Sequence, residues 1–405
     1  MIRLDDALQM VLSSARPLGS ERVELRDALN RVLAEDVAAD MDMPPFDKAL
    51  VDGYACRQAD LADGLTVVET IPAGAVPTKT IGPNQCAKIM TGAAVPPGAD
   101  CVIMLEQTEA AGENTIRFTG NGTSDHISRK AEDIRTGQVI LRKGSRIGPP
   151  HIAALASAGC VRPLAAKRPK VAVIASGNEL VAPAMRPGPS QIRNTNGPQL
   201  IAQLEAIGVK ARDCGIIQDV AADIDRALKA ALAENDVVIV SGGVSVGDFD
   251  LVPAVLRQNK VELLFEKMAV KPGKPTIFGV SKAARLRSAG RMPATRQTYC
   301  FGLPGNPVAT FVVFELLVKP FLYRLMGHDY APITVQMSLD ECVTRKDTDR
   351  QSWIPVKRTS TTTVKPVQYH GSAHMRALCE ADGLISMDIG VASVEEATAV
   401  QVRLL

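Results

Sequence analysis

The stretch Ser241–Asp250, SGGVSVGDFD, directly follows the apolar run VVIV at 237–240 and decides how this chain is expected to fold. A short run of β-branched residues predicts a buried strand, and glycines after it predict a tight turn. Two similar loops follow strand-like runs, KPGKP at 271–275 and GLPGNP at 302–307. Glycine turns gather backbone N–H groups, and fixed lysines add positive charge. The three loops together predict a site for a small, multiply charged anion such as phosphate.

Strands alternate with helical patterns on both sides of this stretch. The expected strands are 171–175, 209–217, 237–240 and 261–265, a hairpin joins 276–280 to 299–303, and the expected helices are 198–207, 221–233, 251–258 and 308–326. This alternation predicts a three-layer α/β/α domain with a mainly parallel sheet over 169–327. Ligands bind such sheets at the carboxyl ends of the strands.

The remainder of the chain predicts a multidomain α/β plus β protein. Helical patterns at 4–14, 25–33 and 151–158 predict a discontinuous helical or linker domain made of 1–41 and 134–168. Short β-like runs broken by Gly and Pro predict two β-rich modules, one over 42–133 and a C-terminal β-barrel over 328–405.

The composition indicates which classes of partner are unsuited to this protein and where in the cell it is expected. The 405 residues carry 46 basic and 44 acidic side chains, a net charge of +2, and only 4% are aromatic. This balance argues against nucleic acid or a membrane surface as partner. Eight cysteines without a Cys-x-x-Cys pair and an N-terminus without signal-peptide features predict a cytoplasmic protein. The five histidines form no metal-binding pattern.

Several candidate site residues can be interpreted either as ligand-binding or as structural. Asp250 is either a ligand for a hard cation or an N-cap of the helix that follows. The lysines of the 267–274 segment either converge on an anion or are solvated, although the prolines after Lys271 and Lys274 favour convergence. Asp52 precedes Gly53, which alone indicates only a turn. Glu179 follows a central strand, a position that favours ligand or metal contact.

Taken together, the motifs resemble the molybdopterin molybdenumtransferase family, which includes MoeA and the gephyrin E domain. The resemblance covers nearly the whole chain. The matching phrases are PPFD…DGYA at 44–55, 89–93, 132–134, 176–180, 191–196, 241–250, 271–275, 303–307 and 371–378.

The resemblance implies four domains and an elongated homodimer, in which the β-rich domain of one subunit faces the α/β domain of the other. It implies that adenylylated molybdopterin and molybdate react, with Mg²⁺ or another divalent cation, to give molybdenum cofactor and AMP. Small-molecule substrates and other proteins of molybdenum cofactor biosynthesis are the implied partners, with neither nucleic acid nor membrane among them.

The resemblance also assigns roles to residues. The implied catalytic residues are Asp52, Asp133, Glu179, Asp219, Asp250, Lys267, Lys271 and Lys274, with Glu179 and Asp250 as metal ligands. The implied substrate-binding residues are Thr91, Ser241, Gly242, Gly243, Ser245, Gly247, Pro304, Asn306, Pro307, Arg350 and Ser372.

Several positions depart from the family pattern. Lys48-Ala49 stands where Asn-Ser is common, Asn178 and Asn194 replace Asp, Ser128 replaces Arg, and Ala309 replaces Ser. Two alternatives to molybdate insertion stay open, the first of them because of these departures. One is a non-catalytic paralogue that binds pterin or serves as a scaffold. The other is molybdopterin adenylyltransferase activity, because related α/β domains carry a similar glycine loop.

Overall fold

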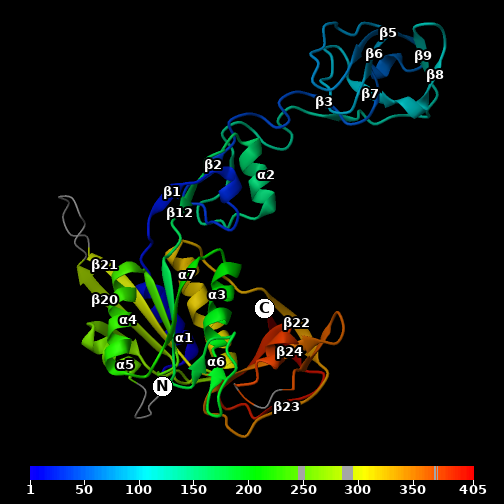
Figure 1. Ribbon diagram of the computed structural model, residues 1–405. Helices are drawn as coiled ribbons and strands as arrows, with labels where there is room; N and C mark the ends of the chain where they lie inside the picture. The colour runs from blue at the N-terminus through cyan, green and yellow to red at the C-terminus, as the bar shows by residue number, and fades with distance from the viewer. Residues whose placement is uncertain (245–250, 285–294, 369–370, 372) are drawn as a thin grey trace. The chain divides into compact units, whose positions relative to one another are not determined.

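The computed structural model describes residues 1–244, 251–284, 295–368, 371 and 373–405 (Figure 1). The chain forms two compact units. The large unit contains Met1–Glu21, Asn30–Ala34 and Leu164–Leu405, and the small unit contains Arg22–Leu29 and Glu35–Pro163. No helix among the described residues is long and apolar enough to cross a membrane. The predicted combination of an α/β part with β-rich parts is confirmed, whereas the predicted domain limits stay predictions.

A six-stranded sheet forms the centre of the large unit. Its strands are, in order, β16 (Ala211–Ile217), β13 (Val171–Ser176), β17 (Val237–Ser241), β21 (Thr295–Leu303), β20 (Ile277–Ala284) and β18 (Val261–Phe265). Only β20 runs against the others. The predicted hairpin is confirmed, because Ile277 pairs with Gly302 and Val280 with Tyr299.

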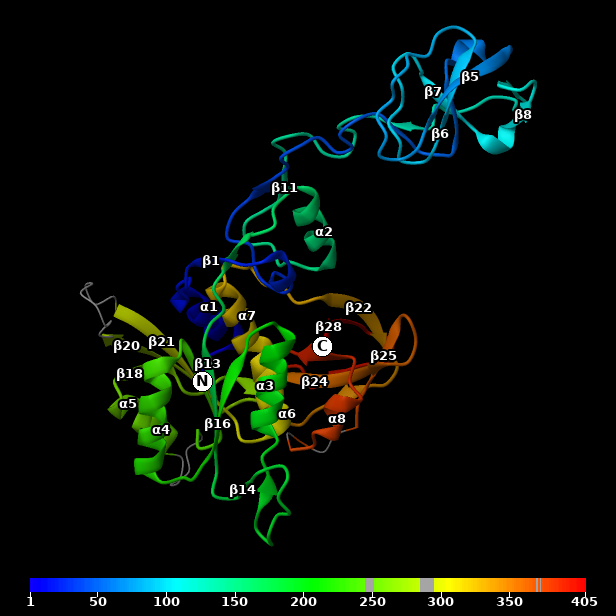
Figure 2. The same cartoon turned by 45° about the horizontal axis from the view of Figure 1, so that its top comes forward.

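Helices cover both faces of this sheet. Alternate residues of a strand point to opposite faces, so Val237 and Ile239 enter one apolar cluster, while Val238 and Val240 enter another. The first cluster includes residues of α1 (Leu4–Ser14), α3 (Asn196–Ala206), α6 (Pro307–Val313) and α7 (Lys319–Leu325). The second includes residues of α4 (Ala221–Glu234) and α5 (Val252–Gln258). Figure 2 shows α4 and α5 on the side of the sheet away from α3 and α6.

Two predictions about the N-terminal region are corrected. The helical patterns at 4–14 and 151–158 predict two helices that pack together, but the buried residues of α1 join the core of the large unit, and residues 151–158 belong to the small unit. The hydroxyl of Tyr299 also donates to the carbonyl of Ser14 at 3.0 Å. The predicted helix at 25–33 is only a 3₁₀ turn, Leu25–Asp27. Asn30 adopts a left-handed φ of 61°, and Leu33 forms a β-bridge with Ala165, so this apolar pattern is buried by an extended segment.

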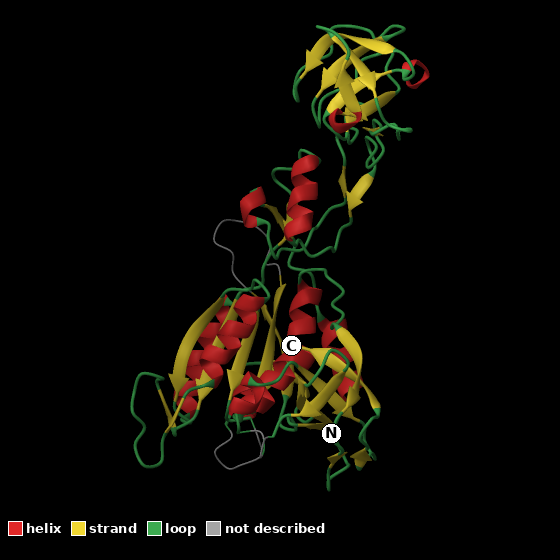
Figure 3. Cartoon of the chain, turned by 90° about the vertical axis from the view of Figure 1, so that its right-hand side faces the viewer, coloured by secondary structure: helices red, strands yellow, loops and turns green. Residues whose placement is uncertain are grey.

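The C-terminal strands close into a barrel. They are β22 (Thr334–Leu339), β24 (Gln351–Arg358), β25 (Thr363–Pro366), β26 (Gly383–Met387) and β28 (Ala399–Leu404). Because β24 pairs with both β25 and β26, the sheet returns on itself. A short strand outside the barrel sequence, β19 (Val270–Lys271), joins its edge in parallel with β24 and places Lys271 opposite Ser352. Figure 3 shows the barrel strands in yellow near the C-terminus.

The small unit is built on a second six-stranded sheet. Its order is β7 (Cys101–Met104), β4 (Gly53–Cys56), β6 (Gln85–Ile89), β5 (Gly64–Ile71), β9 (Thr115–Phe118) and β8 (Thr108–Ala110). Shorter pairs join β3 (Lys48–Ala49) to β10 (Ile127–Ser128) and β2 (Val37–Ala38) to β11 (Val139–Leu141), and α2 spans Pro149–Ser157. Strand β4, next to the edge strand β7, aligns Cys56 with Cys86 on one side and with Cys101 on the other.

Candidate functional site

Five strands of the large unit end at one edge of its sheet. Strands β16, β13, β17, β21 and β18 all point the same way, so the loops after each of them lie at this carboxyl edge. Two of the predicted anion-binding loops follow the neighbouring strands β17 and β21, and the lysine loop follows β18, which β20 separates from β21; all three lie at the edge where ligands bind parallel sheets.

A cavity of about 640 Å³ opens at this edge. Of the predicted site residues, it is lined by Glu179, Ser241, Asn306 and Pro307. Its other lining residues are Ala175, Ser176, Leu180, Pro187, Gln191, Ile192, Arg193, Asn194, Thr195, Asn196, Gly305, Ala373 and Met375. Ala373 and Met375 belong to the C-terminal segment, so the α/β part and the C-terminal part of the large unit share the cavity.

Gly242 fits its place only because it has no side chain. Its φ of +93° is left-handed, and a Cβ there would lie 2.1 Å from the carbonyl oxygen of Ser176. The backbone of the loop after β17 therefore runs directly against the end of β13. Such close approach is the reason glycine is needed where a chain turns tightly.

The hydroxyl of Ser241 forms hydrogen bonds to other parts of the protein. The residue is only 2% exposed, and its Oγ donates to the carbonyl of Pro304 at 3.2 Å and accepts from Asn196 Nδ2 at 2.7 Å. A hydroxyl has one proton to donate. Ser241 lines the cavity as predicted, but its proton is already used between two loops.

Two carboxylates lie near the end of β13. Glu179 is exposed and lines the cavity; its side chain folds back over Gly177, where an added Cβ would lie 2.6 Å from the carboxylate. Asp219 accepts the Ser176 hydroxyl at 2.6 Å, and its backbone N–H donates to Asn178 Oδ1 at 3.0 Å. Glu179 is thus available to the cavity, while Asp219 is held by its neighbours.

The three predicted lysines share one loop at the same edge. Lys267, Lys271 and Lys274 are all exposed and lie between β18 and β20. The carbonyl of Lys274 accepts the N–H of Met268, which brings the ends of the segment together. None of the three lines the 640 Å³ cavity, so their convergence on it is not observed in the described part of the chain.

Arg350 precedes the barrel strand that pairs with the lysine loop. Its guanidinium contacts Asp347 Oδ2 at 2.5 Å, and this bond holds the pKa of Asp347 well below its usual range. Arg345 fixes the same turn by donating to the carbonyl of Arg350 and to Ser352 Oγ, both at 2.6 Å. Arg350 is therefore close in register to Lys271, which pairs with Ser352.

In the small unit, the structure brings Asp52 and Thr91 together. The N–H and the hydroxyl of Thr91 both donate to Asp52 Oδ1, at 2.6 and 2.7 Å. These bonds, the backbone one first, lower the pKa of Asp52. Asp133 is exposed, and its N–H donates to the carbonyl of Met43; it makes no contact with this pair.

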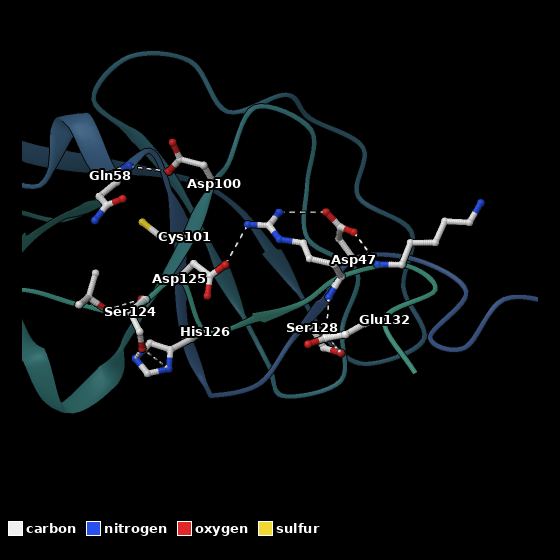
Figure 4. A network of polar contacts seen from close by, with 12 residues as sticks. Asp47, Gln58, Asp100, Cys101, Ser124, Asp125, His126, Ser128 and Glu132 are labelled. Carbon is white, nitrogen blue, oxygen red and sulfur yellow. Dashed lines mark hydrogen bonds and ion pairs between the residues drawn. The ribbon is translucent and has the colours of Figure 1, made fainter. Parts of the chain in front are cut away.

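A second polar network of the small unit surrounds Arg129 (Figure 4). Its guanidinium contacts Asp47 at 3.1 Å and Asp125 at 3.0 Å, and the backbone N–H of Lys130 donates to Asp47. Ser128, one of the departures from the family pattern, donates to Glu132 at 2.8 Å. The network ties together the segments before β3 and after β10.

Sequence reasoning found part of this site. Ser245, Gly247, Asp250 and Ser372 lie outside the described residues. It does not identify Asn196 as a site residue, although Asn196 lies in the matching phrase 191–196. The available signal was an Asn-Thr-Asn run immediately before a helical pattern. Among the described residues, no group of three or more His, Cys, Asp or Glu side chains could hold a metal ion by itself.

Three family descriptions match successive parts of the chain. Residues 2–159 match "MoeA N-terminal region (domain I and II)", 172–324 match "Probable molybdopterin binding domain", and 342–405 match "MoeA C-terminal region (domain IV)".

Similar proteins extend over the full length. A Staphylococcus aureus (strain Mu50) protein named molybdopterin molybdenumtransferase is 36% identical, covering 96% of this chain and 92% of its own. A Staphylococcus epidermidis protein of the same name is 34% identical, covering 100% and 95%. The crystal structure of a molybdopterin biosynthesis MoeA protein from Pyrococcus horikosii has a TM-score of 0.79 at 31% identity, covering 100% and 99%. This chain belongs to the molybdopterin molybdenumtransferase family of molybdenum cofactor biosynthesis.

Proposed function

We propose that this protein transfers molybdenum from molybdate to adenylylated molybdopterin and releases AMP. The observation that carries the proposal is the 640 Å³ cavity at the carboxyl edge of the sheet, which is lined by Glu179, by Ser241 at the end of β17 and by the loops after β13 and β21. Its volume lies within the range usual for small-molecule sites.

The residues of the cavity suit a phosphoanhydride. The helix α3, eleven residues long, begins at the cavity wall, and the positive end of a helix dipole favours phosphate. Gly242 keeps the backbone after β17 close to the end of β13, where N–H groups can approach a ligand. Lys271 and Lys274 add positive charge at the same edge, on the side where β19 joins the barrel.

Glu179 is the residue that we expect to hold Mg²⁺. Magnesium is usually bound by one or two carboxylates together with substrate phosphates, rather than by a cage of protein ligands. The Glu179 carboxylate lines the cavity and makes no hydrogen bond to a described side chain, so it fits this role. When bound, the ion would neutralise charge on the phosphates. Asp250 stays a proposed second ligand.

The remaining predictions belong to the same proposal. We propose a homodimer of four-domain subunits in which Asp52 and Asp133 serve the cavity of the neighbouring subunit. The lysines and Arg350 would bind phosphate or molybdate, and the reaction would take place in the cytoplasm.

The decisive experiment measures AMP release by purified protein from adenylylated molybdopterin, with and without molybdate and Mg²⁺. We expect AMP release that depends on both. Glu179→Gln should reduce the rate strongly, while Glu205→Gln, on the exposed surface of α3, should leave it unchanged. Pterin binding without AMP would identify a non-catalytic relative. ATP consumption with pyrophosphate release from unmodified molybdopterin would identify an adenylyltransferase.

A further inference from the structure

Two loops of the cavity are joined by buried side chains rather than by regular backbone pairing. We call residues 241–244 the Ser241 loop and residues 304–307 the Pro304 loop. They follow the adjacent strands β17 and β21, whose last paired residues are Ser241 and Leu303. Beyond this pair, one backbone bond continues, from the N–H of Gly242 to the carbonyl of Leu303 at 3.1 Å.

Asn196 links both loops to the start of α3. Its Nδ2 donates to Ser241 Oγ and to the carbonyl of Gly305, each at 2.7 Å, and the residue is 7% exposed. A carbonyl can only accept a hydrogen bond, so Gly305 fixes which end of the amide is the nitrogen. Both amide protons are therefore used to hold loops, and neither is left for a ligand.

Thr310 forms hydrogen bonds to two carbonyls of the Pro304 loop. It lies on α6, is completely buried, and its hydroxyl contacts the carbonyls of Pro304 at 2.5 Å and Asn306 at 3.1 Å. The Pro304 carbonyl thus receives hydroxyls from both Thr310 and Ser241. Thr310 is not among the lining residues of the cavity, so it cannot touch a ligand there.

We propose that Thr310, through the Pro304 carbonyl, Ser241 and Asn196, is a positioning residue that sets the distance between the two loops for substrate binding. The inference rests on the proposed function of the cavity. Pro304 and Pro307 have no backbone N–H to donate. Hydrogen bonds from side chains therefore hold the Pro304 loop in place. A displacement of about 1 Å at a reacting site can cost about 100-fold in rate.

The test compares two threonines of nearly equal burial. Thr298 lies towards the opposite end of β21, is 1% exposed, and its hydroxyl donates to the carbonyl of Asn235 at 3.2 Å. Thr310→Val and Thr298→Val therefore remove the same kind of buried bond, the first beside the Pro304 loop and the second away from it. Thr310→Ser keeps the hydroxyl and serves as the rescue variant.

We expect both valine variants to lose similar stability. Only Thr310→Val should raise KM for adenylylated molybdopterin, by about five- to tenfold, with a smaller change in kcat. Thr310→Ser should restore KM. Hydrogen exchange supplies a measurement that does not need activity: amides of the Ser241 and Pro304 loops should exchange faster in Thr310→Val than in Thr298→Val.

Two outcomes would overturn the inference. One is an unchanged exchange rate in both loops of Thr310→Val, which would mean that the hydroxyl does not hold them. The other is an equal rise in KM for the two valine variants, which would mean that the effect is general loss of stability. If the wild-type protein releases no AMP, the proposed function fails, whereas the exchange comparison still decides whether the network holds the loops.

Discussion

Asn178 and Asp219 form a cross-loop pair in which the Asn178 side-chain oxygen accepts the backbone N–H of Asp219 at 3.0 Å. The pair joins the loop after β13 to the loop after β16. Asp219 also receives the hydroxyl of Ser176. An amide at position 178 thus supplies the acceptor without adding a second negative charge beside Asp219.

This pair gives a first prediction. Asn178→Ala should lower the free energy of unfolding by about 1 kcal/mol, because the Asp219 N–H loses its partner. Asn178→Asp keeps the acceptor but places a second negative charge beside Asp219. We expect it to lose less free energy of unfolding than Asn178→Ala, and the loss should become smaller as the salt concentration is raised. Urea unfolding at low and high salt measures both. An alanine variant as stable as the wild type would contradict the assigned bond.

The Asp52–Thr91 pair predicts a pH effect. The folded pKa of Asp52 is lowered, so its stabilising effect is present above the unfolded carboxyl pKa, about 3.9, and is lost as the pH falls through the folded value. Thr91→Val removes the hydroxyl and should bring the Asp52 pKa nearer to its ordinary value. NMR titration of the Asp52 carboxyl carbon measures this, and Thr78→Val, which affects Glu69 instead, is the control.

Gly242 should not tolerate a side chain. Gly242→Ala combines a left-handed φ with a Cβ 2.1 Å from the Ser176 carbonyl, so we expect a loss of stability well above the roughly 1–2 kcal/mol of left-handed strain alone. Gly215→Ala isolates that strain, because Gly215 has a φ of +77° and nothing within 4 Å of an added Cβ. Denaturant unfolding of the two variants, if equal, would show that the contact with β13 is unimportant.

Exposed cysteines should react with a thiol reagent in the native protein, and buried cysteines should not. Cys56 and Cys101 are fully buried with their sulfurs 3.6 Å apart, and this contact followed by burial raises the pKa of Cys56. Burial raises the pKa of Cys86 to about 12. Because the thiolate is the reactive form, Cys56 and Cys86 should stay unlabelled in native protein at pH 8, and Cys101 should stay unlabelled because it is fully buried. The exposed Cys342 and Cys379 should react, and mass spectrometry of labelled peptides identifies each site. Rapid native labelling of Cys86 would contradict the fold of this sheet.

The local parts of this structure could be predicted from sequence. The run 237–240 alternates between two apolar clusters, and the glycines after it end the strand, so both strand and turn follow from neighbouring residues. The apolar pattern at 25–33 predicts a helix that does not form, because nothing local indicates that Leu33 bridges Ala165.

The contacts across the site could not be predicted in the same way. The role of Asn196 depends on the carbonyl of Gly305, 109 residues further along the chain. A family motif marks such a residue without revealing its partner. Similarly, nothing local in the sequence indicates that the backbone of Lys271 pairs with Ser352 of the barrel.

That pairing has a mechanical consequence. Lys271 has its backbone in a ladder with β24, although its own loop begins and ends in the α/β sheet. Any tilt of the barrel would therefore displace the main chain of Lys271. The positive charge of the Lys271 side chain would then move together with the C-terminal strands.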